Sequence, residues 1–360
     1  MKISVDILRQ EDYIDFEEFV KLSDSSLIYT SIKYKNFLEK ILVNSKSDYL
    51  IAREGSQLVG ALPTFTIHNK KYGNVLNSLP FYGSNGGIIV SPKISNTASV
   101  IKILVEEFNT LAISNEVSTS TLITNPLDKN SALIQGILPH SYTDMRIGQI
   151  KMLPSSSLMA NNIEDTLMNS YHKKTRNSIR KALKSDLLIS HSDSLKDLQK
   201  LSDFHNQGIK KIGGISKPWN VFLAIRESFE YNIDYRLYLA QKENKIISAL
   251  LVFYYHKTAE YFTPATDPEY RIYQPMSLLI HTAMEEAAKR NCLYWNWGGT
   301  WMTQENVYKF KSRWGTEDHR YYYLIQKYDN RLQEMTKEKL LKEYPNYYVL
   351  PFSELTPTKS

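Results

Sequence analysis

The chain has 360 residues, of which 42% are hydrophobic and 23% charged, and its formal net charge is +6. This length suits two domains, each with its own hydrophobic core. The small positive excess favours contact with anionic groups but is less than a dedicated nucleic-acid-binding protein usually carries. The single cysteine, Cys292, lies in an apolar stretch and excludes an intrachain disulfide, and no Cys/His cluster predicts a metal site.

The N-terminal sequence predicts neither a signal peptide nor a membrane anchor, because it carries acidic residues early and has no long apolar run. The most apolar stretches, such as 246–253, are too short to span a bilayer. We therefore expect a cytoplasmic enzyme without a transmembrane segment, and the sequence leaves its oligomeric state open.

The first half of the chain shows a strand pair, a loop, a helix and a strand. Two apolar strands lie within 49–65 and are separated by a polar turn at 54–56. A glycine-rich loop follows at 78–87, then a helix over 98–114 and a strand over 120–124. The serine-rich stretch at 154–158 is the best candidate for a linker between two domains.

A basic helix is predicted over 167–183, because Leu167, Tyr171, Ile179, Ala182 and Leu183 recur at helical spacing. Between 172 and 184 the sequence contains no acid and many cations, namely Lys173, Lys174, Arg176, Arg180, Lys181 and Lys184. Three of these stand one turn apart, where like charges repel unless an anion is bound. The helix is either a phosphate-binding face or a solvated face of a mildly basic protein.

The second half repeats the order of the first. Residues 237–253 align without gaps to residues 49–65, and their polar turn at 242–244 corresponds to the turn at 54–56. A loop at 266–275, a helix over 275–290 and a strand over 293–297 follow. Strands joined by a tight turn are antiparallel, and a strand reached through a helix is expected to be parallel to its predecessor.

This internal repeat predicts an α/β fold of tandem duplicated GNAT-like domains, with mixed sheets flanked by helices. The expected domains are 1–153 and 154–330. Residues 331–360 are expected to form a helical tail, with a short charged helix over 332–341.

The most unusual segment is Trp295–Trp301, which contains Gly298 and Gly299. The two glycines are expected to let the backbone turn sharply and approach a ligand. A short helix over 304–314 follows, in which Phe310 and Trp314 are expected to face the core. Lys311 is then expected at the mouth of an aromatic-walled pocket, where one cation acts strongly on a developing negative oxygen. The alternative is an ordinary surface lysine.

These segments together resemble the FemAB-like and BioF2-like proteins of the GNAT superfamily, which include transferases that build peptidoglycan cross-bridges. The resemblance covers about 28–324 and rests on the following segments: Ser31–Leu38, Val59–Pro63, Ser78–Phe81 with Gly86–Gly87, Tyr171–Ala182, Gly298–Thr300 and Phe310–Gly315. It implies a tandem GNAT fold without a metal and assigns Lys311 to the transfer chemistry.

Further candidate residues follow from the same resemblance. Arg176, Arg180 and Lys211 are candidates for binding phosphates of a precursor, and Lys35 for binding substrate. Lys211 stands where the family has an arginine. A lysine offers one positive charge but cannot donate the two parallel hydrogen bonds that a guanidinium makes to a phosphate. Another departure is Tyr34, which stands where the family usually has tryptophan. The remaining candidates, which would line the substrate cleft, are Tyr261, Tyr270, Gly298, Gly299, Phe310 and Trp314.

The predicted reaction is acyl transfer to nitrogen without a covalent enzyme intermediate. The expected acceptor is an amine on a nucleotide-linked or lipid-linked precursor of the cell envelope or of a polysaccharide. No tightly bound cofactor is expected, and the donor is aminoacyl-tRNA or acyl-CoA. Two alternatives remain: an acetyl-CoA-dependent N-acetyltransferase acting on an amino sugar, and a non-catalytic module that binds an anionic glycan precursor or RNA.

Overall fold

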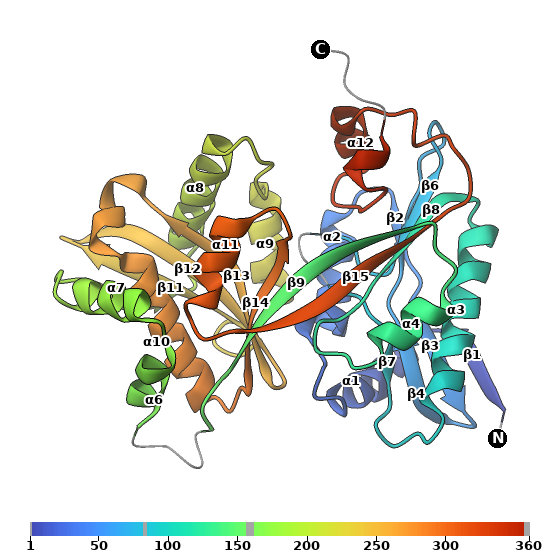
Figure 1. Ribbon diagram of the computed structural model, residues 1–360, viewed down its shortest axis with the longest axis horizontal. Coiled ribbons are helices and arrows are strands. Elements are labelled where there is room, and N and C mark those ends of the chain that lie inside the picture. The colour runs from blue at the N-terminus through green and yellow to red at the C-terminus, as the bar shows by residue number, and fades with distance from the viewer. Residues whose placement is uncertain (1, 82–84, 156–161, 356–360) are drawn as a thin grey trace. The chain divides into compact units, whose positions relative to one another are not determined.

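The computed structural model describes residues 2–81, 85–155 and 162–355 (Figure 1). The chain forms two compact units, which we call unit 1 (Met1–Ile147 and Arg320–Ser360) and unit 2 (Gly148–His319). The chain passes between them inside two long strands, β9 (Tyr142–Met152) and β15 (Glu317–Lys327). Residues 82–84 of the predicted glycine-rich loop and 156–158 of the predicted linker lie outside the described residues.

Unit 1 contains the first predicted repeat. Its strands are β1 (Ile3–Ile7), β2 (Ser45–Ser47), β3 (Leu50–Glu54), β4 (Gln57–Leu62), β5 (Phe65–Ile67), β6 (Asn74–Asn77), β7 (Ile89–Val90) and β8 (Val117–Ile123). Its helices are η1 (Gln10–Asp12), α1 (Tyr13–Lys21), η2 (Ile28–Thr30), α2 (Ile32–Ile41), α3 (Thr97–Ser114), α4 (Ser131–Ile137), α12 (Lys337–Glu343) and η4 (Phe352–Glu354).

The strands of unit 1 form two hydrogen-bonded sets, β1-β3-β4-β7 and β15-β8-β6-β5-β2. The strands β3 and β4 pair antiparallel across the predicted turn, where Gly55 has a φ of 64°. The strand β8 follows α3 and pairs parallel with β6, as expected for a strand reached through a helix. The helix α3 packs against the first set through the fully buried Val100, Ile101 and Leu104.

The C-terminal residues differ from the predicted domain boundaries. Residues 320–330 were expected in the second domain, but β15 pairs antiparallel with β8 of unit 1. Residues 331–360 were expected as a separate tail, yet the Tyr344 hydroxyl donates to the Gly73 carbonyl at 2.7 Å. The predicted helix over 332–341 begins later, at Lys337, because Thr336 caps it by accepting from the Lys339 N–H.

Unit 2 contains the second repeat. Its helices are α6 (Ile163–Ser170), α7 (Lys173–Leu183), α8 (Leu195–Lys211), α9 (Trp219–Ser228), η3 (Pro268–Tyr273), α10 (Pro275–Lys289) and α11 (Glu305–Ser312). Its strands β10 (Leu188–Ser192), β11 (Tyr235–Lys242), β12 (Lys245–Tyr255), β13 (Thr258–Thr266) and β14 (Tyr294–Trp301) are hydrogen-bonded in that order. The turn between β11 and β12 has φ values of 51° at Glu243 and 63° at Asn244. Both central residues of this two-residue hairpin are thus in the left-handed region.

Strand directions and helix faces in unit 2 agree with a GNAT-like layout. The strand β14 follows α10 and pairs parallel with β13. Alternate residues of β11 and β12, such as Tyr238 and Leu250, pack with α6, α7 and α10 on one face of the sheet. The opposite face carries α8 and α9, and there Phe229 contacts Phe253 with ring centroids 4.8 Å apart.

The predicted basic helix is two helices. The chain leaves helical geometry at Tyr171 and His172, which have ψ angles of 152° and 149°, and the His172 ring caps α7 by accepting from the Lys174 N–H. Leu183 was expected on the apolar stripe but is 56% exposed, so α7 is held by its other apolar residues.

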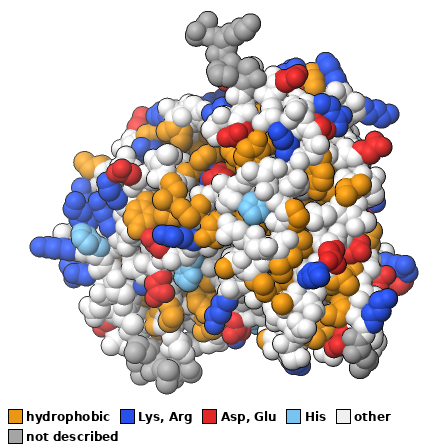
Figure 2. Space-filling model, turned by 45° about the vertical axis from the view of Figure 1, so that its right-hand side comes forward, with side chains coloured by type: hydrophobic (Ala, Val, Ile, Leu, Met, Phe, Trp, Pro, Cys, Tyr) orange, Lys and Arg blue, Asp and Glu red, His pale blue; other side chains and the backbone are white. Residues whose placement is uncertain are grey.

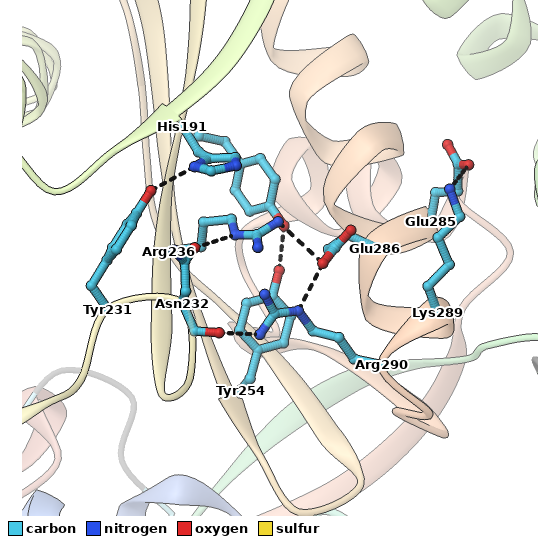
Figure 3. Close-up of polar contacts among 10 residues, drawn as sticks. His191, Tyr231, Asn232, Arg236, Tyr254, Glu285, Glu286, Lys289 and Arg290 are labelled. Carbon is cyan, nitrogen blue, oxygen red and sulfur yellow. Dashed lines mark hydrogen bonds and ion pairs between the residues drawn. The ribbon is translucent and has the colours of Figure 1, made fainter.

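An ion-pair network ties the end of α10 to the sheet of unit 2 (Figure 3). The Glu286 carboxylate lies 3.1 Å from Nη1 of Arg236 on β11 and 2.9 Å from Nε of Arg290. Beneath it, the hydroxyls of Tyr238 and Tyr254 hydrogen-bond at 2.5 Å. Within the described residues no helix is both long and apolar enough to cross a membrane.

Candidate active site

Lys311 is buried at the point where α11 packs on β14, with a residue exposure of 6%. Its Nζ donates to the Thr300 hydroxyl at 3.0 Å, to the Gly299 carbonyl at 3.1 Å and to the Gly298 carbonyl at 3.3 Å. The three acceptors match the three N–H groups of an ammonium. The expectation of a lysine at a pocket mouth is therefore corrected to a buried lysine held by the strand beneath it.

No carboxylate of the described residues pairs with Lys311, so burial sets the pKa of this lysine. Desolvation lowers the pKa of Lys311 to about 8, so its ammonium form predominates at neutral pH but is easily lost at alkaline pH. The Thr300 hydroxyl donates in turn to Oε1 of Gln149 at 3.2 Å, which orients the hydroxyl oxygen toward Lys311. The result is a positioned positive charge in a poorly solvated environment.

Aromatic rings surround this segment as predicted, but two details differ. The predicted turn at Gly298 and Gly299 is absent, because both residues stay in β14, where Gly298 has a φ of 69°. Trp314 is buried, whereas Phe310 was expected in the core and is 38% exposed. The rings of Phe310 and Trp297 lie 5.8 Å apart and meet edge to face. Phe310 therefore separates the buried aromatic cluster from open space.

That space is a pocket of about 480 Å³ in unit 2. Its walls are largely apolar and come from α8, the end of β13, the start of α10 and α11. The lining residues are Phe204, His205, Gly208, Ile209, Ile212, Pro264, Ala265, Thr266, Arg271, Gln274, Pro275, Met276, Ser277 and Phe310. The lining contains one permanent cation and no carboxylate, and it ends on the residue that precedes Lys311. A pocket with apolar walls and a few polar groups is typical of a ligand site.

His205 is the titratable ring in this pocket. Its Nε2 accepts from the Lys217 backbone N–H at 3.4 Å, which assigns the ring proton to Nδ1. Burial, assisted by the positive charge of Lys217, lowers the pKa of His205 to about 4. The ring is therefore neutral at physiological pH.

The start of α10 forms one end of the pocket, and its backbone donors are mostly occupied. Pro275 is the first helical residue and has no N–H. The Ser277 N–H donates to the Gln274 carbonyl at 3.1 Å, and the Gln274 N–H donates to the Arg271 carbonyl at 3.0 Å. Gln274 adopts a left-handed conformation with φ 58°. This helix start consequently offers fewer free amides than a glycine-rich phosphate-binding loop.

Other predicted site residues of unit 2 are distributed around this centre. Arg180 is exposed on α7, while Arg176 on the same helix is half-buried and donates to the Tyr171 carbonyl. Lys211 is exposed at the end of α8, next to the pocket-lining Ile212. Tyr261 is held in the aromatic cluster, 4.7 Å from Trp297.

Two predicted substrate contacts have their own protein partners. Tyr270 lies on η3, where its hydroxyl is 3.4 Å from Nζ of Lys245 and it does not line the pocket. Lys35 belongs to unit 1 and is buried, with its Nζ 2.7 Å from a Glu39 carboxylate oxygen and 3.1 Å from the Tyr13 hydroxyl. These contacts raise the pKa of Lys35 despite its burial, because Glu39 and Tyr13 both hydrogen-bond to its ammonium.

Sequence patterns missed several groups that the fold brings together. Gln149 and Thr300 lie far apart in the chain and meet through the pairing of distant segments. His205 carried no motif, and its place in the pocket follows from the packing of α8 on β13. Lys151 was also missed: it is buried, donates to the Ser170 hydroxyl at 2.8 Å, and has its pKa lowered to about 8 by desolvation. A local signal existed at Gln274, because a residue before Pro275 cannot easily be helical.

The chain has a tandem GNAT-like fold, which it shares with solved structures. FemX aligns with a TM-score of 0.70 at 14% identity over 90% of this chain and 97% of its own. A tandem GNAT protein from the clavulanic acid biosynthesis pathway aligns with a TM-score of 0.52 at 10% identity, covering 91% and 98%. A conserved protein of unknown function from Bacteroides thetaiotaomicron gives 0.54 at 13% identity, covering 90% and 100%.

A segment that lies almost entirely in unit 2 is similar to the FemAB family. The family model matches residues 227–322, a range that includes β14, α11 and Lys311. The FemAB-like resemblance expected from the sequence is thereby confirmed, on a fold shared with FemX. No curated protein matches the sequence significantly.

Proposed function

We propose that this protein is an N-acyltransferase that moves an activated aminoacyl or acyl group onto an amine of a peptidoglycan or related cell-envelope precursor. The observation that carries this proposal is the buried Lys311, held by Thr300 and two glycine carbonyls next to an apolar pocket. The match of this segment to the FemAB family supports the reaction class.

The chemistry needs little beyond orientation and charge. The neutral amine of the acceptor attacks the carbonyl carbon of the donor ester or thioester, and a C–N bond forms while the carbonyl oxygen becomes negative. The bond to the leaving oxygen or sulfur then breaks, and the amine proton is transferred to that leaving group. Lys311 would donate a hydrogen bond to the oxyanion, exchanging its longest contact, 3.3 Å to Gly298, for the stronger one.

The pocket supports an RNA 3′ end as donor more than coenzyme A. A pyrophosphate is usually bound by several free amides at a helix start, and in α10 Pro275 lacks an N–H while Gln274 and Ser277 use theirs. The apolar walls with Phe310 suit a stacked base. His205 is neutral, so Arg271 supplies the one positive charge of the pocket lining. A single charge suits one phosphate better than a pyrophosphate.

One observation favours acyl-CoA as the second candidate donor. The pocket lies where the strand β13 ends and α10 begins, next to the splayed strands β13 and β14, and a helix start attracts anions even when several amides are occupied. An amino sugar would then be the corresponding acceptor.

A donor comparison tests the proposal. Purified protein is incubated with a nucleotide-linked precursor bearing a primary amine, and either a 3′-aminoacylated RNA or acetyl-CoA, and the products are weighed by mass spectrometry. We expect the mass of one aminoacyl residue to be added from the RNA donor. If only the acetyl group is transferred, acyl-CoA is the donor instead of aminoacyl-RNA. If neither donor gives transfer, the protein is not an acyltransferase. Isothermal titration with acetyl-CoA measures binding of that donor independently.

A further inference from the structure

The exposed face of α7 is strongly basic and free of acidic partners. Five exposed cations form it: Lys173, Lys174, Arg180 and Lys181 of the helix and Lys184, which caps its C-terminus. Among the described residues, none of these five makes an ion pair with a carboxylate. Figure 2 shows Lys and Arg side chains gathered at the left, at the end of unit 2 where Figure 1 places α7. An unrelieved group of like charges is stabilised when a polyanion binds.

The C-terminal part of this face is hollow rather than flat. Asn177, Arg180, Lys181, Lys184 and Ser185 line an open depression of about 510 Å³. Arg180 and Lys184 are four residues apart and therefore lie about 6 Å apart along the helix axis. Guanidinium, ammonium, amide and hydroxyl groups in one depression can contact phosphates and ribose hydroxyls together.

The basic hollow continues toward the pocket of the candidate active site. Lys242, at the end of β11, donates from Nζ to the Ser185 carbonyl at 3.0 Å. The same Nζ lies 4.8 Å from the ring centroid of Tyr273 on η3. The next residue, Gln274, and Arg271 of the same turn line the pocket. A chain of contacts thus runs from the end of α7 across Lys242 and η3 to the pocket, entirely within unit 2.

Anchoring of the other end of α7 fixes this path relative to Lys311. The Arg313 carbonyl, two residues after Lys311, accepts from the His172 N–H at 2.8 Å and from the Thr175 hydroxyl at 3.1 Å. The ring of Tyr171 meets that of Trp314 at 5.0 Å. The start of α7 is therefore packed directly against the segment that follows the buried lysine.

We propose that this surface, the α7 face with Lys242, docks the double-stranded stem of an RNA donor whose single-stranded end enters the pocket. This inference rests on the proposed function and adds where the body of the donor binds. The face contains no exposed aromatic ring, so it suits phosphate and ribose contacts along a duplex rather than base stacking. A membrane surface fits less well, because Leu183 is the one exposed apolar side chain of α7 and a planar bilayer cannot follow a hollow.

The test measures binding rather than turnover. A fluorescent RNA hairpin with a single-stranded 3′ overhang is titrated with protein at several salt concentrations, and its anisotropy gives Kd. Arg180→Glu combined with Lys184→Glu removes two exposed cations of the hollow. The matched control combines Lys196→Glu with Lys200→Glu, which reverses two exposed lysines on α8, on the opposite face of the sheet.

We expect the α7 variant to weaken hairpin binding at least about tenfold and to reduce the slope of log Kd against log salt by about 2. The control should bind like the wild type, and thermal melts should show both variants folded. Equal losses in both variants, or an unchanged Kd in the α7 variant, would overturn the proposal. Wild-type binding to phosphatidylglycerol vesicles without binding to the hairpin would overturn it in favour of a membrane surface.

A second arm separates this inference from the proposed function. Wild-type transfer from a short aminoacylated 3′-terminal dinucleotide, which has no stem, reports on the chemistry alone. If this short donor is used but the α7 variant binds the hairpin like the wild type, the docking surface is overturned. The proposed acyltransferase activity is then still supported. Failure of this transfer counts against the proposed function, while the hairpin titration decides the surface.

Discussion

Two buried lysines of unit 2 show why the surroundings of Lys311 matter more than its burial. Lys151 and Lys311 are both buried, and desolvation lowers the pKa of each to about 8. Lys151 donates to one hydroxyl, packs over the Tyr171 ring at 5.5 Å, and lies outside the segment that matches the FemAB family. Lys311 adjoins the pocket through Phe310 and is held by acceptors that a substrate oxygen can replace. The same charge thus has a structural environment at Lys151, whereas the surroundings of Lys311 suit the reactive role that we propose for it.

The acidity of Lys311 predicts the alkaline limit of the reaction. In the proposed mechanism the ammonium form stabilises the oxyanion. Because the pKa of Lys311 is lowered to about 8, kcat/KM should fall about tenfold per pH unit above that value. Arginine at this position stays charged throughout. The residual activity of Lys311→Arg should therefore lack this descending limb in a pH–rate profile. A limb near pH 8 that persists unchanged in the variant would assign it to another group.

Among the elements, the turn after α11 fixes how the helix that carries Lys311 meets the rest of unit 2. Gly315 has a φ of 73°, a left-handed conformation, and a Cβ there would lie 2.6 Å from the Ser170 carbonyl oxygen. Close packing of this turn on the end of α6 therefore requires glycine for two reasons, conformation and space.

A pair of glycine substitutions separates these two reasons. Gly213 has a similar φ of 69° but open space around its Cα, so Gly213→Ala should cost only the strain of a left-handed alanine, about 1–2 kcal/mol. Gly315→Ala should cost about 1–3 kcal/mol more because of the added contact. Denaturant unfolding followed by tryptophan fluorescence measures both, since all five tryptophans lie between 219 and 314 in unit 2. If both variants lose the same free energy of unfolding, the backbone at Ser170 moves to accommodate the added Cβ at little cost.

The end of α10 provides a prediction about electrostatics. Hydrogen bonding to Arg290 and the charge of Arg236 lower the pKa of Glu286 against a desolvation effect that alone would raise it. A carboxylate with a lowered pKa stabilises the fold when the pH is above the pKa of the unfolded state, near 4.5. This contribution is lost as the pH falls through the pKa of the folded state. Glu286→Gln should therefore lose about 1 kcal/mol of stability at pH 7 and almost nothing near pH 3.

The neighbouring residue supplies the control for that experiment. Among the residues that the structure describes, Glu285 forms an ion pair only with the more exposed Lys289, at 2.5 Å in an i,i+4 arrangement (Figure 3). Glu285→Gln should change the free energy of unfolding by no more than about 0.5 kcal/mol. A larger effect at Glu285 than at Glu286 would contradict the structural importance assigned to the network.

For the whole molecule, periodic and repeated features were predictable from sequence. The hairpins at 54–56 and 242–244, the long helices α3 and α10, and the parallel strands that follow them were confirmed, because each depends on local patterns or on connection geometry. The predicted boundary at the end of unit 2 was wrong. The sequence of β15 does not indicate its pairing partner, β8, which lies about 200 residues earlier in the chain.

The candidate site divides in the same way. The glycine–aromatic segment and Lys311 carried a local motif, so the sequence indicated them. The pocket did not, because its walls come from α8, β13, α10 and α11, and a neutral His205 has no sequence signature. Burial depth was also hidden: Lys311 was expected at a mouth and Phe310 in the core, and their positions are closer to the reverse. Helical spacing alone does not tell which side of a short helix faces a cavity.

The most direct test of the central claim is transfer by Lys311→Met compared with Lys309→Met. Lys309 is on the same helix but exposed and paired with Glu305 at 2.8 Å, so its loss should leave turnover near wild type. Rapid-quench single turnover with saturating aminoacyl donor and precursor measures the chemical step. The buried ammonium predicts a rate about 10²–10³-fold lower for Lys311→Met with the fold intact. A folded Lys311→Met protein with the rate of the wild type would contradict the account.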